Sequence, residues 1–219
     1  MIKLTEINKS YKMRHVLDGL SLEVKAGETI AVQGRSGSGK TTLINIMAGL
    51  MTQYNGSYMF ENEKMNEMSD SKRAKFRREK IGIITQHFDL LEDRNVKANI
   101  ALGLAHLKIP QKEKREKIRK MLDYIGLAGY EKKRISELSG GEMQRVAIAR
   151  ALIKKPKIII ADEPTGALDE ETKDQILDLF KKMMNDGSQF IIVTHDDDVA
   201  KICEKIYYLK KGVLKEKTA

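Results

Sequence analysis

The octet at residues 34–41, Gly-Arg-Ser-Gly-Ser-Gly-Lys-Thr, constrains the fold of this chain more than any other stretch. It follows a short apolar run at residues 29–32 and precedes a helical pattern with Leu43, Ile46 and Leu50 on one side. Glycines let the backbone curl so that several N–H groups point at one phosphate, and the N-terminus of the next helix adds its positive dipole end. A strand, a glycine-rich loop and a helix in this order predict a phosphate-binding P-loop.

The P-loop predicts how a nucleoside triphosphate and Mg²⁺ are held. We expect Lys40 to reach the β- and γ-phosphates as a point charge, and the Thr41 hydroxyl to bind Mg²⁺. The full set of predicted phosphate-binding residues is Gly34, Arg35, Ser36, Gly37, Ser38, Gly39, Lys40, Thr41 and Thr42. Ahead of the loop, Tyr11 lies in a segment that also holds Val16, and its ring could stack on an adenine or serve as a half-buried strand tyrosine. The spacing alone does not decide between these two roles.

Short apolar runs place the P-loop in an α/β fold. Near-continuous apolar character is typical of parallel strands buried under helices, and such runs lie at residues 30–32, 158–161 and 190–193. Stretches that alternate or look extended suit an antiparallel flank to the nucleotide site, and they lie at residues 1–7, 20–24 and 57–60. The predicted fold is therefore a P-loop core with a mainly parallel sheet and an antiparallel β flank.

A long helical segment interrupts this core. Residues 69–80 read as a charged helix, and the apolar strand that follows ends on Gln86. From Glu92 to Lys154 the pattern is helical, with no strand-like run. We therefore expect one domain over residues 1–219, in which an inserted helical subdomain at 87–154 divides the nucleotide-binding core into 1–86 and 155–219.

Two carboxylates end the strand at residues 158–161 and carry the second part of the predicted chemistry. The carboxyl ends of strands form the ligand-binding edge of an open α/β sheet, so Asp162 and Glu163 are expected beside the P-loop. Asp162 is placed to hold Mg²⁺, directly or through water. Glu163 is placed as general base on the water that attacks the γ-phosphate. The alternative, a plain turn at Asp-Glu-Pro, is the weaker one because a P-loop lies upstream.

A second glycine-rich helix start lies at residues 138–145, Leu-Ser-Gly-Gly-Glu-Met-Gln-Arg. Ser139 and Glu142 form a Ser-x-x-Glu capping box, which has a structural role by itself. Gly140 and Gly141 leave bare amides at a helix N-terminus, which makes a second anion site in a chain that already has one. One phosphate chain does not easily reach two distant helix ends of one subunit. We therefore expect Ser139, Gly140 and Gly141 to bind the nucleotide of another subunit.

Composition and charge restrict the class of protein. Hydrophobic residues make up 41% and charged residues 32% of the chain, which is typical of a folded globular protein. No run approaches the roughly 18 apolar residues of a membrane span, and the alternating start has no signal-peptide core. The four histidines lack the spacing of a structural zinc site. The single cysteine, Cys203, fits a reducing cytoplasm, and its helical stripe with Val199, Ile202 and Ile206 predicts buried packing.

The formal net charge of +9 bears on the partners of the chain. The basic residues are spread and are not interleaved with aromatics, so nucleic acid is not expected as the main ligand. Between Lys112 and Ile125, Glu-to-Lys pairs four residues apart indicate a solvated helix face. The surplus positive charge could still help to hold the protein near an anionic inner leaflet.

The P-loop, Leu-Ser-Gly-Gly-Glu and Ile-Ile-Ile-Ala-Asp-Glu, in this order, resemble the nucleotide-binding subunit of an ATP-binding cassette (ABC) transporter. The resemblance covers nearly the whole chain and implies an ATPase that uses ATP and Mg²⁺. It implies that Tyr11 stacks on adenine, with Val16 beside it. It also implies that Gln86 touches Mg²⁺ and couples to a membrane subunit, and that His195 lies near the γ-phosphate. Residues 167–169, Ala-Leu-Asp, match a loop that crosses the dimer interface.

Two departures from the family pattern are small. Arg35 stands where many relatives have proline or a small residue, and Gly166 replaces a commoner serine. Pro-Thr-Gly-Ala-Leu-Asp at residues 164–169 is similar to the branch with macrolide exporters, lipoprotein-release systems and bacitracin-type resistance transporters. Residues 76–82 together with 86–91 are most similar to lactococcin-type bacteriocin-export ATPases. This implies export or detachment of a peptide, a lipid-like compound or an antimicrobial compound.

The resemblance also implies a working assembly. Two copies face head to tail and close on ATP as a homodimer, on the cytoplasmic face of the membrane, with a transmembrane permease as a separate subunit. Lys40, Gln86, Glu163 and His195 are then the catalytic residues, and Thr41, Gln86 and Asp162 the metal-binding ones. Two other classes remain as alternatives: a soluble cassette ATPase acting on DNA or ribosomes, and a cell-division or sensor subunit that signals without transport.

Overall fold

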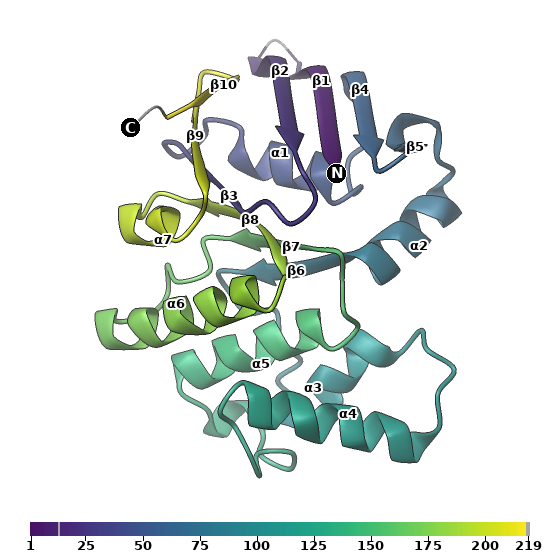
Figure 1. Ribbon diagram of the computed structural model, residues 1–219, viewed down its shortest axis with the longest axis vertical. Coiled ribbons are helices and arrows are strands. Elements are labelled where there is room, and N and C mark those ends of the chain that lie inside the picture. Colours follow the sequence, from purple (N-terminus) through teal and green to yellow (C-terminus); the bar gives the residue numbers. More distant parts are fainter. Residues whose placement is uncertain (13, 218–219) are drawn as a thin grey trace.

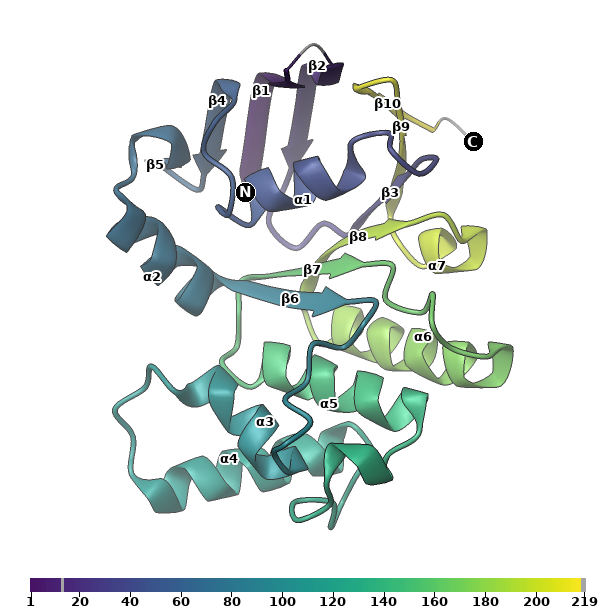
Figure 2. The same cartoon turned by 180° about the vertical axis from the view of Figure 1, so that it is seen from behind.

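The computed structural model, which describes residues 1–12 and 14–217, contains an antiparallel sheet at one end of the molecule and a second sheet near its middle (Figures 1 and 2). The antiparallel sheet has the strand order β2 (Arg14–Val24), β1 (Ile2–Tyr11), β4 (Asn55–Phe60) and β5 (Glu63–Lys64). The other sheet has the order β10 (Val213–Glu216), β9 (Lys205–Lys210), β3 (Ile30–Gln33), β8 (Gln189–Thr194), β7 (Ile158–Asp162) and β6 (Ile81–Thr85). Adjacent strands of this sheet are parallel from β9 to β6, and β10 pairs antiparallel with β9. The predicted α/β fold is thus confirmed.

Helices lie between the sheets and on the far face of the parallel strands (Figure 1). α1 (Lys40–Met47) lies between the two sheets. α5 (Gly140–Leu152) and α6 (Glu170–Asn185) cover the opposite face of the parallel strands, and α3 (Val96–Ala101) and α4 (Gln111–Tyr124) pack on α5. The remaining helices are α2 (Asp70–Lys80) and α7 (Asp197–Lys201), and 3₁₀ turns lie at Met65–Glu67, Leu102–Leu104 and Ile135–Glu137.

The core between the sheets fixes the helix that follows the P-loop. In β1 the buried side chains Ile2, Leu4 and Ile7 are at most 1% exposed. Alternate residues of a strand share a face, so Leu4 and Ile7, three residues apart, would lie on opposite faces of a regular strand. An irregularity in the β1–β2 register between them reverses the alternation, and both side chains are buried on the same side. On α1, Leu43 and Ile46 are fully buried against this sheet and the parallel strands. The start of α1 is therefore held firmly where the P-loop ends.

The opposite face of the parallel sheet fixes α6, whose first turn lies next to the candidate site. Phe180 of α6 and Phe190 of β8 are fully buried, and their ring centroids lie 5.1 Å apart. Aromatic pairs at this separation add packing energy beyond the area that they bury. The helices of the predicted insertion have a second core of their own, formed by Val96, Ile100 and Leu122 with their neighbours.

Most of the elements expected from the sequence are present, and one is not. The strands at β3, β6, β7 and β8 and the charged helix α2 lie where predicted, and no strand interrupts Glu92 to Lys154. The helical stripe through Cys203 is wrong, because α7 ends at Lys201 and Ile206 belongs to β9. Cys203 still packs, partly buried, against the α5–α6 core. Among the residues described, no helix is long and apolar enough to cross a membrane.

Candidate functional site

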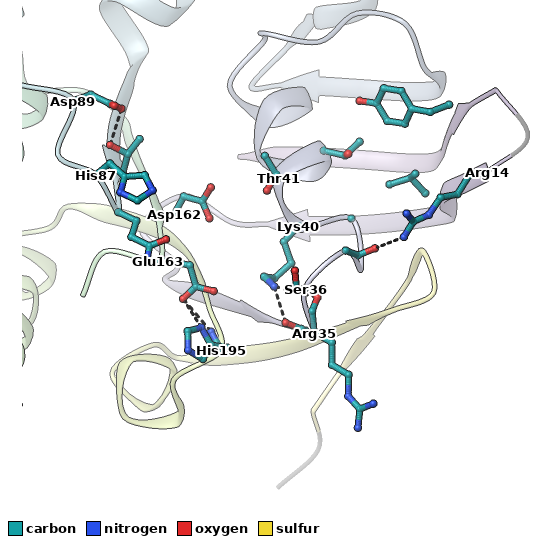
Figure 3. A pocket seen from close by; sticks show the side chains of 18 residues that line it. Arg14, Arg35, Ser36, Lys40, Thr41, His87, Asp89, Asp162, Glu163 and His195 are labelled. Atoms are coloured by element: carbon teal, nitrogen blue, oxygen red, sulfur yellow. Dashed lines mark hydrogen bonds and ion pairs between the residues drawn. The ribbon is translucent and has the colours of Figure 1, made fainter. Parts of the chain in front are cut away.

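One edge of the parallel sheet brings the predicted site residues together. The P-loop follows β3, Gln86 follows β6, Asp162 ends β7 with Glu163 directly after it, and His195 follows β8. These segments surround an open cavity of about 940 Å³ (Figure 3). The side chains and loops that line it are those of Tyr11, Arg14, Val16, Gly34, Arg35, Ser36, Gly37, Gly39, Lys40, Thr41, Thr42, Thr85, Gln86, His87, Asp89, Asp162, Glu163 and His195.

The P-loop has the geometry of an anion cradle. Gly39 has φ of 110°, and a Cβ there would lie 2.8 Å from the Val16 carbonyl oxygen, so only glycine lets the loop pass this close to β2. Lys40 begins α1, and its Nζ donates to the carbonyl oxygens of Gly34 at 2.6 Å and Arg35 at 3.3 Å. Ser38 Oγ is buried without a hydrogen-bond partner among the residues described. An ammonium that bonds only to loop carbonyl oxygens is available to bind a phosphate.

Asp162 lies where a divalent cation would be favourable. It is partly buried at the end of β7 and lines the cavity together with Thr41. Burial, and then the neighbouring Glu163 carboxylate, raise the pKa of Asp162 above its ordinary value, while Lys40 opposes them. Two adjacent carboxylates in a partly buried site repel each other, and a cation relieves this repulsion. The hydroxyl of Thr41 and the carboxylate of Asp162 are oxygen ligands of the kind that Mg²⁺ prefers.

Glu163 and His195 form a directly bonded pair. Glu163 Oε2 accepts a hydrogen bond from the His195 backbone N–H at 3.2 Å and lies 3.0 Å from His195 Nδ1 (Figure 3). The Glu163 backbone has φ of 46°, an uncommon value for a residue with a side chain, and its N–H donates to the Val193 carbonyl oxygen at 2.8 Å. The Glu163 side chain is only 17% exposed, whereas that of His195 is 74% exposed. The carboxylate is therefore held in one orientation at the edge of the cavity.

Gln86 approaches the loop after Glu163, and Gly166 makes this approach possible. A Cβ on Gly166 would lie 3.0 Å from Gln86 Nε2. A side chain at this position would force the Gln86 amide to shift by a few tenths of an ångström. The departure at Gly166 therefore lets the Gln86 amide lie close to the backbone that carries Glu163.

Tyr11 and Val16 lie on the side of the cavity formed by the antiparallel sheet. Tyr11 is 47% exposed, so about half of the residue faces solvent and the rest is covered. Its hydroxyl donates to Met51 Sδ at 3.6 Å, and Lys9 Nζ lies 4.7 Å from the ring centroid. A solvent-exposed aromatic ring beside a phosphate cradle is available for stacking on a base.

Ser139, Gly140 and Gly141 do not line this cavity. They form the start of α5, where Ser139 Oγ accepts from the Glu142 N–H and Glu142 Oε2 accepts from the Ser139 N–H at 2.8 Å, so the predicted capping box is present. The Tyr130 hydroxyl donates to the other carboxylate oxygen at 2.9 Å. These bonds, that of Ser139 first, hold the pKa of Glu142 below its ordinary value although burial opposes them.

The start of α5 also packs on the segment after Glu163. A Cβ on Gly141 would overlap the Cγ2 of Thr172 in α6, so the two helices meet at a contact that only glycine permits. The buried Gln144 donates from Nε2 to the Pro164 carbonyl oxygen. Within one chain, the start of α5 therefore contacts the segment that follows Glu163.

Four cavity residues were not predicted from the sequence: Arg14, Thr85, His87 and Asp89. Arg14 donates to the Gly37 carbonyl oxygen at 3.2 Å, and Thr85 Oγ1 donates to Asp89 Oδ2 at 2.7 Å. His87 and Asp89 follow Gln86 closely, so their neighbourhood was a usable signal. Ser38 was expected at the phosphate, but it lines a smaller neighbouring cavity and not this one.

Comparisons with known proteins agree with the geometry of the cavity. A family model described as "ABC transporter" matches residues 17–166. The bacitracin export ATP-binding protein BceA of Halalkalibacterium halodurans is 36% identical over 97% of this chain and 86% of its own length. The macrolide export ATP-binding/permease protein MacB of Mannheimia succiniciproducens is 36% identical over 100% of this chain, which spans 34% of that longer protein.

A solved structure gives the same result for the fold. It is described as a dimeric, post-hydrolysis state of the ATP-binding cassette MJ0796, a protein of Methanocaldococcus jannaschii, bound to ADP and Pi. It superposes with a TM-score of 0.90 at 38% sequence identity, over 100% of this chain and 98% of that one.

Proposed function

The chain belongs to the ABC transporter family as an ATP-binding subunit, an ATPase that uses ATP with Mg²⁺, and from that premise we propose how its residues divide the work. Each copy supplies the P-loop, the metal ligands and the base for one ATP, and Ser139, Gly140 and Gly141 for the ATP of a second copy. The observation that carries this proposal is that these three residues lie at a helix N-terminus outside the cavity that the other site residues share.

The residues of the cavity suggest a direct route to hydrolysis. Lys40 exchanges its bonds to the loop carbonyls for the β- and γ-phosphate oxygens of ATP. Thr41, Asp162 and the Gln86 amide would hold Mg²⁺, which neutralises charge that develops on the phosphates. Glu163 takes a proton from the attacking water, and His195 orients the carboxylate through the two contacts to Oε2.

The second copy completes the site electrostatically. The N–H groups of the first turn of α5 have no intrahelical acceptor, and the helix dipole places partial positive charge there. A γ-phosphate between this helix end and the P-loop of the partner would join the two copies. Binding of ATP then favours the closed dimer, and hydrolysis removes the γ-phosphate that holds it together.

We further propose that a transmembrane permease is the stable partner and that the dimer works at the cytoplasmic face of the membrane. The inserted helices at 87–154, with Gln86 at their root, would transmit closure to that partner. The names of MacB and BceA specify export of a macrolide and of bacitracin, so an antimicrobial or similarly amphipathic compound is the substrate class that we propose. Among these, the bacteriocin-type peptide suggested by residues 76–82 is the narrowest option.

The composite site is tested with a variant that binds ATP but does not hydrolyse it. In the Glu163→Gln background, Mg-ATP is expected to convert the protein to a dimer, measured by sedimentation velocity. Adding Ser139→Phe should leave ATP affinity of the monomer unchanged and abolish the dimer, because the exposed Ser139 lies outside the cavity of its own subunit and its bulky replacement would block the nucleotide of the partner. Ser71→Phe, at an exposed position on α2, is the matched control and should dimerise normally. A Ser139→Phe variant that still dimerises would exclude the head-to-tail arrangement.

A further inference from the structure

Lys173 is a buried cation on α6 that the proposed mechanism does not use. The residue is 8% exposed, and its Nζ lies 2.6 Å from Glu170 Oε2, 3.3 Å from Asp196 Oδ2 and 3.9 Å from Asp198 Oδ2. A buried ammonium is costly unless carboxylates surround it, and here the hydrogen bond to Glu170 leads the contacts that raise the pKa of Lys173. Glu170 belongs to the same helix turn, whereas Asp196 and Asp198 belong to the segment that follows β8. Lys173 therefore joins two elements.

One end of this connection is the loop that carries His195. Asp196 is the next residue in the chain, and its position is fixed on three sides. Its Oδ1 accepts from the N–H groups of Asp198 at 2.8 Å and Val199 at 3.4 Å, and its own N–H donates to Thr194 Oγ1 at 3.0 Å. The same short loop places the His195 N–H and ring on Glu163 Oε2. A shift of Asp196 must therefore shift the contacts that orient the general base.

The other end is the first turn of α6, which touches the start of α5. Asp169 caps α6 by accepting from the Thr172 N–H at 2.9 Å and from the Thr172 hydroxyl at 2.9 Å. Thr172, directly before Lys173, is the residue against which Gly141 packs. The contact series from Gly141 through Thr172 and Lys173 to Asp196 connects the helix end that serves one ATP with the base that serves the other.

We propose that Lys173 is a positioning residue for hydrolysis: it holds the His195 loop against α6, so that the geometry of Glu163 and His195 depends on where the start of α5 lies. This inference rests on the proposed head-to-tail dimer for its consequence, which is that an ATP bound at Gly141 sets the alignment of Glu163 in the same subunit. The Lys173–Asp196 contact itself does not depend on that dimer. Physical continuity alone does not establish coupling, so the test measures coupling directly.

The main variant is Lys173→Met, which keeps the length of the side chain and removes its charge. Because small misplacements of catalytic groups cost one to two orders of magnitude, we expect kcat to fall about 10-fold to 100-fold. ATP affinity should stay within about twofold, because no group that contacts the nucleotide is changed. The Hill coefficient for ATP should fall toward 1. The control is Lys181→Met on the same helix, whose exposed pair with Asp178 is remote from the site, and it should leave all three quantities unchanged.

A double-mutant cycle separates positioning from general damage. Asp196→Asn keeps a good helix cap but removes the charge that Lys173 contacts. If the two side chains act through their mutual contact, the double variant should lose no more kcat than the more impaired single variant. Losses in kcat that multiply, or a Lys173→Met enzyme with wild-type kcat, would overturn the proposal. Should Lys173→Met not fold, Lys173→Gln carries the same cycle. If the wild-type protein hydrolyses ATP as a monomer, the proposed head-to-tail dimer is refuted. The double-mutant cycle of Lys173 and Asp196 still decides whether Lys173 positions the catalytic groups.

Discussion

Replacement of Glu163 by glutamine tests the assignment of the general base with little change in shape. Glu163 Oε2 accepts the His195 N–H and faces His195 Nδ1, and the amide oxygen of glutamine can take both contacts. Oε1 has no hydrogen-bond partner among the described residues, so the NH₂ group of glutamine displaces no other bond. The strained backbone at φ of 46° is retained in the variant. What the substitution removes is the basicity of the carboxylate.

The expected loss of kcat follows from the removal of the basicity of Glu163 alone. A positioned general base contributes about 10²–10⁴-fold to a rate, so kcat should fall by that factor. At 1.36 kcal/mol for each factor of ten, the barrier rises by about 2.7–5.4 kcal/mol. ATP affinity should be nearly unchanged, and the ATP-bound dimer should accumulate because its decay is blocked. Hydrogen bonds to a neutral amide are weaker than those to a carboxylate, which adds a small local cost to the His195 loop.

The assay is steady-state phosphate release with saturating Mg-ATP, alongside sedimentation of the same sample. Glu171→Gln is the matched control, since Glu171 is an exposed glutamate in the first turn of α6. It should keep wild-type turnover and should not accumulate dimer. Turnover in Glu163→Gln that equals the wild type would show that another residue activates the water.

Three further predictions concern the nucleotide site and the pH range of stability. Lys40→Ala should abolish nucleotide binding or hydrolysis, measured by equilibrium binding and phosphate release, and normal affinity with normal turnover would contradict the P-loop assignment. Tyr11→Ala should weaken ATP binding by about 0.5–1.5 kcal/mol if the ring stacks on adenine, whereas Tyr11→Phe should not; equal affinities in titration calorimetry would exclude stacking. The pKa of Glu28 lies below the ordinary 4.5: burial raises it, but the contacts with Lys205 Nζ at 2.6 Å and the Lys25 N–H at 2.8 Å lower it by more. Because the pKa of Glu28 is lower in the folded than in the unfolded state, its ionised form stabilises the fold at pH values above the unfolded-state pKa. Glu28→Gln should therefore reduce the free energy of unfolding at pH 7, and the difference from wild type should vanish as the pH falls below 4.5 and through the folded-state pKa. A difference in the free energy of unfolding that persists at about pH 2 would contradict this.

Features that depend on neighbouring residues in the sequence were predictable. The P-loop, the strand ending in Asp162 and the capping box at Ser139 are each specified within about ten residues, and each is present in the structure. The error at Cys203 has the same origin, because an apolar spacing of 3 and 4 was extended past Lys201. The short α7 ends there, and the chain turns into β9. Periodicity cannot show where a helix five residues long stops.

Features that depend on distant contacts were not predictable. Lys173 and Asp196 are 23 residues apart, and nothing in either local sequence indicates that they meet. Arg14 reaches Gly37 only because β2 lies beside the P-loop, and this close approach of β2 also explains why residue 39 must be glycine. The positive φ of Glu163 is likewise imposed by tertiary structure, through the bond of its N–H to the Val193 carbonyl oxygen.

The proposed division of the site between two copies has an electrostatic consequence for a lone subunit. In the proposed site the chain itself supplies a base at Glu163, metal ligands near Asp162 and a lysine at position 40, and the second copy supplies stabilisation of charge on the outer side of the γ-phosphate. A helix N-terminus offers about +0.5 of an elementary charge together with N–H donors already in place, and such preorganised dipoles contribute strongly in a site closed to water. In α5 the Glu142 carboxylate is occupied by Ser139 and Tyr130, which leaves the amides of Gly140 and Gly141 for an external anion. Hydrolysis by single subunits should therefore be slow, and the total hydrolysis rate should rise with the square of protein concentration while the dimer is the minor species.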